Sequence, residues 1–163
     1  TNGSALEKLK WGIVPSWSKK KDFKPLINSR LETIDEKISF KKLIKLKRCI
    51  AIADGFYEWK RTEKEKKPFF FQRQDKKTIY FAGIYDENEF CLITEQASEN
   101  LLAIHHRQPV ILNQKDLKSY LDLQLDGSAF LKEAKKPRLE FYEVSKDVNK
   151  PTNNSVSLIQ KLN

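Results

Sequence analysis

"RCIAIADGFYEWK", residues 48–60, is the stretch from which the fold class is predicted. Its first half, CIAIA, is apolar, and its second half, FYEWK, is aromatic apart from Glu58 and Lys60. Between the halves stands Asp54-Gly55, a dipeptide that favours a tight turn between antiparallel strands. We therefore predict a β-hairpin over residues 48–60, which leaves the single carboxylate among its aromatic side chains to be explained.

The rest of the chain is also rich in runs of aromatic and β-branched residues, which are typical of strands. Further strands or extended segments are expected at residues 11–14, 26–33, 68–73, 78–86, 89–95, 107–112 and 138–145. Helices are expected at residues 39–47, 97–106 and 113–123. This pattern predicts an α+β fold, strand-dominated, with a largely antiparallel, barrel-like sheet and a few peripheral helices.

Two of the expected helices have a defined apolar face. Ser39 is placed to cap the 39–47 helix. That helix has an apolar inner face and a basic outer face, made of Phe40, Leu43 and Ile44 and of Lys41, Lys42 and Lys45 respectively. The 113–123 helix has an apolar stripe of Leu117, Tyr120 and Leu121.

Length and composition predict one globular domain over residues 1–163. The chain is 39% hydrophobic and 33% charged, which argues against disorder. No apolar run approaches the ~18 residues that a membrane helix needs, and no secretory signal is visible. Cys49 and Cys91 fit buried thiols in a reducing cytoplasm better than a disulfide. With only two histidines, which are adjacent, no metal site is expected, and no nucleotide-cofactor motif occurs.

The charge balance favours an anionic partner. The formal net charge is +9 and the pI is about 9.4, which is typical of nucleic-acid binders. Because 25 of the 31 basic residues are lysine, the excess also fits a merely solubilising surface. These two interpretations remain open on charge alone.

Three small groups of residues are candidates for chemistry. Strand alternation places Glu58 on one face with Phe56 and Lys60, and Tyr57 and Trp59 on the other. A carboxyl group in an apolar setting suits proton transfer, although a surface glutamate on the wet face of a hairpin is the plainer interpretation. His105 and His106 should diverge, so that one of them at most faces a given site, and histidine is the usual acid–base residue. Asn28 and Arg30 share one face of an extended segment, where an amide and a guanidinium can hold a sugar and a phosphate.

Together these segments resemble the SRAP (SOS response-associated peptidase) domain. The motifs that carry the resemblance are WGIVPSW (11–17), INSRLET (27–33), RCIAIADGFYEWK (48–60), FAGIYD (81–86), CLITEQAS (91–98), IHHRQPVIL (104–112) and YEVSKDVN (142–149). They extend over most of the chain in the order of that family. The resemblance implies a covalent sensor of abasic sites in single-stranded DNA, which forms a thiazolidine through an N-terminal cysteine exposed by autocatalytic removal of Met.

The resemblance also implies roles for individual residues. Glu58, His105 and Asn28 would be catalytic: Glu58 would move protons to and from the amine, His105 would assist sugar opening and Schiff-base formation, and Asn28 would bind the sugar-derived oxygen. Four residues would contact DNA, namely Arg30, Trp11, Trp59 and Arg107. A monomer bound to single-stranded DNA is expected, with no cofactor and no membrane.

The sequence departs from the family in one chemically decisive way. The N-terminal cysteine does not occur in it, and neither Cys49 nor Cys91 carries a free α-amine. We therefore expect the chain as printed to be inactive in crosslinking and the full-length protein to be active. Two alternatives stay open: a non-catalytic binder of single-stranded nucleic acid, and a cysteine-type peptidase that cleaves other proteins.

Overall fold

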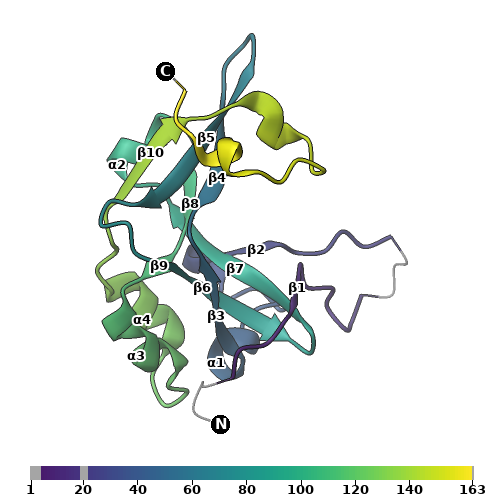
Figure 1. The fold of residues 1–163 in the computed structure, drawn as a ribbon. Helices are drawn as coiled ribbons and strands as arrows, with labels where there is room; N and C mark the ends of the chain where they lie inside the picture. Colours follow the sequence, from purple (N-terminus) through teal and green to yellow (C-terminus); the bar gives the residue numbers. More distant parts are fainter. Residues whose placement is uncertain (1–4, 19–21, 163) are drawn as a thin grey trace. The chain divides into compact units, whose positions relative to one another are not determined.

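The computed structural model describes residues 5–18 and 22–162, which divide into two compact units (Figure 1). The first unit comprises Thr1–Ile52, Tyr80–Glu95 and Pro109–Lys136. The second comprises Ala53–Ile79, Gln96–Gln108 and Pro137–Asn163. The chain therefore passes from one unit to the other several times, and each unit is built from segments that are distant in the sequence.

The first unit is built on a mixed sheet in which β7 (Glu89–Gln96) is central. The short strands β1 (Lys10–Trp11) and β2 (Asn28–Arg30) both pair with β7 in parallel. The strand β6 (Ile79–Asp86) runs antiparallel to β7, and β9 (Ile111–Leu112) runs antiparallel to β6. The strand β3 (Arg48–Ala53) neighbours β6 in the sheet order.

Short helices complete the first unit. They are α1 (Leu43–Leu46), α3 (Leu117–Leu121) and α4 (Gly127–Glu133), with 3-10 turns η1 (Leu31–Thr33) and η2 (Gln114–Asp116). The core that they share with the sheet is mainly aliphatic: Ile13, Leu31, Ile34, Phe40, Leu43, Ile44, Ala82, Ile84, Cys91, Ile93, Val110, Leu112, Tyr120 and Leu131. The buried Tyr120 hydroxyl donates a hydrogen bond to the Gly83 carbonyl at 2.7 Å, which fixes α3 against β6.

A buried arginine also holds this unit together. Arg48 begins β3 and is 6% exposed. Its guanidinium donates to the carbonyls of Tyr120 at 2.8 Å and Leu125 at 2.7 Å, and it lies 5.8 Å from the Tyr120 ring centroid. Burying a charge costs free energy unless the charge is hydrogen-bonded. The hydrogen bonds to these two carbonyls therefore offset the cost of burying the Arg48 guanidinium. The segment between α3 and α4 is thereby tied to β3.

The second unit is built on a three-stranded antiparallel sheet in the order β10-β5-β4. Its strands are β4 (Phe56–Arg61), β5 (Lys66–Arg73) and β10 (Leu139–Glu143). Helix α2 (Glu99–Leu102) precedes β8 (Arg107–Pro109), and the turns η3 (Lys146–Asn149) and η4 (Val156–Ile159) follow β10. Its core is small and aromatic, comprising Phe71, Ala97, Leu101 and Ile104 with Phe56, Phe69, Leu139 and Phe141 packed against them.

The α+β, strand-dominated prediction is confirmed, but the sheets are open: in the described ranges neither sheet closes into a barrel. The predicted 48–60 hairpin is wrong. The strand β3 belongs to the larger sheet, whereas β4 pairs with β5 in the smaller one. The connection at Asp54-Gly55 is therefore a crossover between sheets. Gly55 is required there by close packing, since an added Cβ would lie 2.2 Å from Phe70 Cζ and 2.6 Å from the Phe71 carbonyl oxygen.

The predicted helices exist but are shorter than expected. α1 has four residues, begins after Lys42 and takes no side-chain cap, so the predicted Ser39 cap is wrong. The predicted burial is confirmed, because Phe40, Leu43 and Ile44 are buried while the lysines at 41, 42 and 45 are exposed. Helix α4 was not predicted, although Asp126 caps it by accepting hydrogen bonds from the amides of Ser128 and Ala129.

The extent of the domain stays a prediction, because division into compact units does not decide whether residues 1–163 fold as one domain. In the described ranges no helix is long and apolar enough to cross a membrane.

Candidate active site

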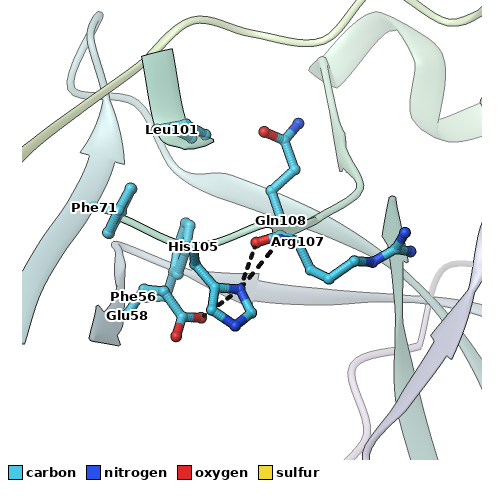
Figure 2. A pocket seen from close by; sticks show the side chains of 7 residues that line it. All are labelled: Phe56, Glu58, Phe71, Leu101, His105, Arg107 and Gln108. Carbon is cyan, nitrogen blue, oxygen red and sulfur yellow. Dashed lines mark hydrogen bonds and ion pairs between the residues drawn. The ribbon is translucent and has the colours of Figure 1, made fainter. Parts of the chain in front are cut away.

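A pocket in the second unit brings together several of the predicted residues (Figure 2). Its lining comes from β4, β5, α2 and the segment that follows α2: Phe56, Glu58, Phe71, Leu101, His105, Arg107 and Gln108. The walls are aromatic, because the rings of Phe56 and Phe71 stack with centroids 4.9 Å apart. The pocket therefore combines an apolar wall with one carboxylate and one imidazole.

Strand alternation explains why a carboxylate lies among aromatic residues in the sequence. Phe56 and Glu58 both line the pocket, while the Tyr57 ring packs on Phe70 and on Trp59, with centroids 5.3 and 6.4 Å apart. The predicted division of the strand into two faces is confirmed. The sequence neighbours of Glu58 thus point away from it, and its aromatic surroundings are instead Phe56, Phe71 and Phe69, the residue opposite it on β5.

Two contacts orient the Glu58 carboxylate. Its Oε1 accepts a hydrogen bond from the Trp59 amide at 3.2 Å, and its Oε2 lies 4.0 Å from Nδ1 of His105. The side chains of Glu58 and His105 are 31% and 35% exposed, so both can be reached from outside. Glu58 is therefore half-buried beside an imidazole, and its catalytic role stays a prediction.

The His105 ring is held by the backbone of the residue two positions later. Nδ1 lies 3.0 Å from the Arg107 carbonyl oxygen, and the Arg107 amide lies 3.2 Å from the same nitrogen. With a proton on Nδ1 the ring donates to the carbonyl, and without that proton Nδ1 accepts from the amide. Both neutral tautomers thus have a backbone partner, which suits a ring that takes up and releases protons.

Of the two adjacent histidines, His105 lines the pocket and His106 does not. This agrees with the prediction that at most one of them faces a given site, while the role of His105 stays a prediction. Their rings do not diverge as expected, because the ring centroids are only 4.5 Å apart. The reason is that the chain leaves α2 here: the His105 amide still bonds to the Leu101 carbonyl at 3.1 Å, whereas the His106 carbonyl already accepts from the Ala97 amide at 3.0 Å.

Gln108 fixes the start of the same loop. Its Oε1 accepts hydrogen bonds from the Ser98 amide at 3.0 Å and the Ser98 hydroxyl at 3.1 Å. This closes residues 98–108 into a loop that carries His105. The sequence reasoning did not find Gln108, Phe71 or Leu101, because only the register between β4 and β5 and the path of the loop bring them to Glu58.

Trp59 lies on the opposite face of β4 from the pocket. Its Nε1 donates to Asn149 Oδ1 at 2.8 Å, and the Lys66 ammonium lies 4.9 Å from its ring centroid. The indole is therefore held in one orientation. Arg107 lines the pocket, but whether Trp59 and Arg107 contact DNA stays a prediction.

The remaining predicted residues belong to the first unit. Asn28 and Arg30 are exposed on β2 and flank the buried Ser29, so the prediction that they share a face is confirmed. Trp11 is 52% exposed, donates from Nε1 to the Ile27 carbonyl at 2.9 Å and stacks on Phe90. Their catalytic and DNA-binding roles, and their placement relative to Glu58 and His105, stay predictions.

The two thiols are chemically quiet. Burial raises the pKa of Cys49 and of Cys91 from 9.0 to about 12. Both are reduced, and both lie in the first unit. Throughout residues 5–18 and 22–162, no group of three or more His, Cys, Asp and Glu side chains is arranged to hold a metal ion.

The chemistry that the pocket offers is proton transfer. It has a carboxylate and an imidazole within reach of each other, but no thiol or amine is among its described lining residues. A pocket of this kind can assist a reaction whose nucleophile comes from elsewhere.

Comparison with known proteins gives consistent matches. The profile of the family described as SOS response associated peptidase (SRAP) matches residues 1–151. The abasic site processing protein YoqW of Bacillus subtilis (strain 168) is 37% identical over 174 residues, which cover 98% of this chain and 78% of YoqW. YoaM of the same bacterium, also named an abasic site processing protein, is 36% identical over 177 residues, covering 99% and 78%. A crystal structure of a protein from Bacteroides thetaiotaomicron matches with a TM-score of 0.81 and 26% identity, covering 94% of this chain and 75% of that one.

Proposed function

Because this chain belongs to the SRAP family, we propose that it processes abasic sites in single-stranded DNA by bonding to them covalently. The names of similar proteins support the substrate, since several of them are abasic site processing proteins. The net charge of +9 supports a nucleic-acid partner.

The observation that carries the proposal is the approach of Glu58 Oε2 to His105 Nδ1, at 4.0 Å, in an accessible pocket. An abasic sugar opens to an aldehyde. An amine that attacks this carbon must first lose a proton, and the resulting carbinolamine must lose its hydroxyl as water to give a Schiff base. Glu58 takes the amine proton, and His105 supplies a proton for sugar opening and for the departing hydroxyl.

The nucleophile has to carry both an α-amine and a thiol. The amine forms the Schiff base, and the thiol then adds to the C=N bond, its proton passing to the nitrogen, so that a thiazolidine ring closes. Only an N-terminal cysteine offers both groups on adjacent carbons. Cys49 and Cys91 have no free α-amine, so the proposal requires such a residue at the mature N-terminus of the complete protein, exposed by removal of Met.

Other residues would position the DNA. Asn28 is proposed to bind the sugar-derived oxygen and Arg30 to hold a phosphate, and their exposure on one side of β2 supports a joint role. The exposed ring of Trp11 suits stacking against a base. Arg107 lines the pocket and is proposed to meet the strand near the lesion.

A denaturing gel tests the proposal directly. The complete, Met-processed protein is mixed with a single-stranded oligonucleotide that carries one abasic site, and a band that survives heat and detergent is expected only with the lesion. Glu58→Gln should slow its formation about 10²–10⁴-fold, the usual contribution of general acid–base catalysis, and His105→Ala should slow it in the same range. Glu63→Gln, which removes an exposed carboxylate from the same hairpin, is the matched control.

The outcomes separate the alternatives. If the complete protein binds the oligonucleotide but gives no covalent band, the covalent proposal is wrong and the non-catalytic binder takes its place. If the band forms at the same rate in Glu58→Gln and His105→Ala as in Glu63→Gln, the assigned roles are wrong. Cleavage of unrelated polypeptides that is abolished by Glu58→Gln would instead favour the peptidase.

A further inference from the structure

The hairpin formed by β4 and β5 ends in two cations that face each other. Arg61 and Lys66 are directly opposite in the register, and both are exposed. Side chains at directly opposite positions lie on the same face of a sheet, and like charges placed there destabilise it. Such a pair is easier to understand if an anion binds between the two side chains.

Two other cations near this end of the hairpin, Lys67 and Lys146, are paired with carboxylates. Lys67 Nζ lies 3.3 Å from a Glu143 carboxylate oxygen and 3.5 Å from one of Glu65, and Lys146 lies 2.9 Å from Glu65. In the part of the chain that the structure describes, Arg61 and Lys66 form no ion pair with a carboxylate. Lys60, on the Glu58 face, and Lys64, in the turn, form no ion pair with the described residues either. Of the like-charged pairs at opposite positions, Lys60–Lys67 and Arg61–Lys66, however, only the second has no carboxylate of the described residues beside either member.

The same face carries an aromatic ring that is held in place. Trp59 is two residues before Arg61, so the two side chains share a face. Asn149 Oδ1 accepts from the indole Nε1 at 2.8 Å, and Lys66 Nζ lies 4.9 Å from the ring centroid. A fixed aromatic face beside cations is the combination by which proteins bind single-stranded nucleic acid.

The position of β4 connects this face with the proposed active site. β4 is an edge strand of its sheet, and the Trp59 amide bonds to the Glu58 carboxylate rather than to a strand. A ligand that leaves the Glu58 face can therefore reach the Trp59 face around the edge of one strand. At a rise of about 3.3 Å per residue, Arg61 is only about 10 Å along the strand from Glu58.

We propose that Trp59, Arg61 and Lys66 form a nucleotide subsite for the strand that carries the lesion, which rests on the function proposed above. A base stacks on the Trp59 ring, and the phosphate attached to the same nucleotide lies between Arg61 and Lys66. Lys66 exchanges its contact with the ring for the phosphate, so the ring face becomes available when the strand binds. The subsite extends the footprint of the protein beyond the abasic sugar.

The test is the salt dependence of binding, measured on the complete protein with a fluorescent single strand that carries an abasic site. Arg61→Gln/Lys66→Gln should lower the slope of log K against log salt by about 0.7, the loss of one phosphate contact on a single strand. The control is Lys64→Gln/Lys118→Gln, which removes the same charge from two exposed lysines, one in the turn of the same hairpin and one on α3, and should keep the wild-type slope. Thermal melting of both double variants verifies that they fold.

The results distinguish this inference from the function on which it rests. A lower slope in the first variant alone supports the subsite, whether or not a covalent band forms. If the wild-type protein crosslinks and both variants keep its slope, the subsite is wrong while the proposed function stands. If both variants lose the same slope, the effect is only that of net charge and the subsite is wrong. If the wild-type protein neither binds nor crosslinks, both proposals are wrong.

Discussion

The two units differ in how far their key polar side chains are buried and hydrogen-bonded. In the first unit, Arg48 is 6% exposed and its guanidinium is directed at two backbone carbonyls. In the second, Glu58 and His105 are about a third exposed and lie 4.0 Å apart, beyond an ordinary hydrogen bond. In Arg48 two guanidinium nitrogens are bonded to the backbone, and only the buried Nε has no hydrogen-bond partner among the described residues. The pair suited to proton transfer is instead accessible, and its two groups are not directly hydrogen-bonded to each other.

The two cores support this difference. The first core is mainly aliphatic and includes Cys91, while Arg48 is also buried and Cys49 is half-buried. The second is smaller and aromatic, and the stacked rings of Phe56 and Phe71 form the wall of an open pocket. The aromatic walls flank Glu58 without covering it. We therefore predict that mutations of these side chains in the first unit change stability or thiol reactivity, whereas mutations of those in the second unit change the rate of crosslinking.

The largest expected effect concerns the thiols of the closed unit. Since the pKa of Cys49 and of Cys91 is raised from 9.0 to about 12, their thiolate fraction at pH 8 is lower than in the unfolded chain. The thiolate is the reactive form, so alkylation in the folded protein should be slower by on the order of a thousandfold. The measurement is iodoacetamide labelling with and without denaturant, resolved by peptide mass spectrometry. Fast labelling of the folded protein at either site would contradict the view that this unit is closed.

The same pKa shift determines how the stability of the folded protein changes with pH. A thiol whose pKa is higher in the folded protein contributes stability that is fully present below pH 9, its value in the unfolded chain. This contribution is lost as pH rises from about 9 toward 12. Cys49→Ala/Cys91→Ala should therefore lose less stability than the wild-type protein when both are moved from pH 8 to pH 10.

The next effect concerns Arg48. Arg48→Met keeps the aliphatic bulk but leaves the carbonyls of Tyr120 and Leu125 without their charged donor, at a cost of about 3 kcal/mol. For a protein of this size, that lowers the melting temperature by roughly 6–12 °C. Arg138→Met, at an exposed position, is the control and should change stability by less than about 0.5 kcal/mol.

Arg48→Met also tests the separation of roles. Crosslinking per folded molecule should stay near that of the wild-type protein, because Arg48 lies in the closed core of the first unit and outside the Glu58 pocket. Glu58→Gln should show the reverse, a large loss of rate with little change in melting. If both variants lost rate and stability together, the distinction between a group that holds the fold and a pair that moves protons would be wrong.

The sequence was most informative about properties of a single strand, namely where it lies in the chain and which side chains share a face. Alternation along β4 correctly separated Glu58 from Tyr57 and Trp59, and aromatic and β-branched runs correctly indicated the strands. It was less informative about which strands pair with each other. Nothing local says that β4 pairs with β5 and that β3 neighbours β6, because pairing is a long-range property.

The helices show the limits of periodicity. The 97–106 pattern predicts ten helical residues, but α2 ends at Leu102, and the chain then turns so that His105 meets the backbone of Arg107. Conversely, Asp126 before Gly-Ser-Ala was a usable capping signal for α4 that the apolar pattern alone did not reveal. The pocket itself needed both the loop path and the β4–β5 register, so most of its lining was beyond local reasoning.

The smallest expected effect tests what Asp54-Gly55 does. A Cβ on Gly55 would lie 2.2 Å from Phe70 Cζ and 2.6 Å from the Phe71 carbonyl oxygen, so Gly55→Ala forces the ring and strand to shift, at a cost of about 1–3 kcal/mol. Asp54 is exposed, and Asp54→Ala should change stability by less than about 0.5 kcal/mol. Urea unfolding of the two variants separates the two interpretations. A tight hairpin turn would need both residues, whereas a crossover packed against the aromatic sheet needs only the glycine. Equal losses in both variants would therefore favour a tight turn at Asp54-Gly55 over a connection that needs only the glycine.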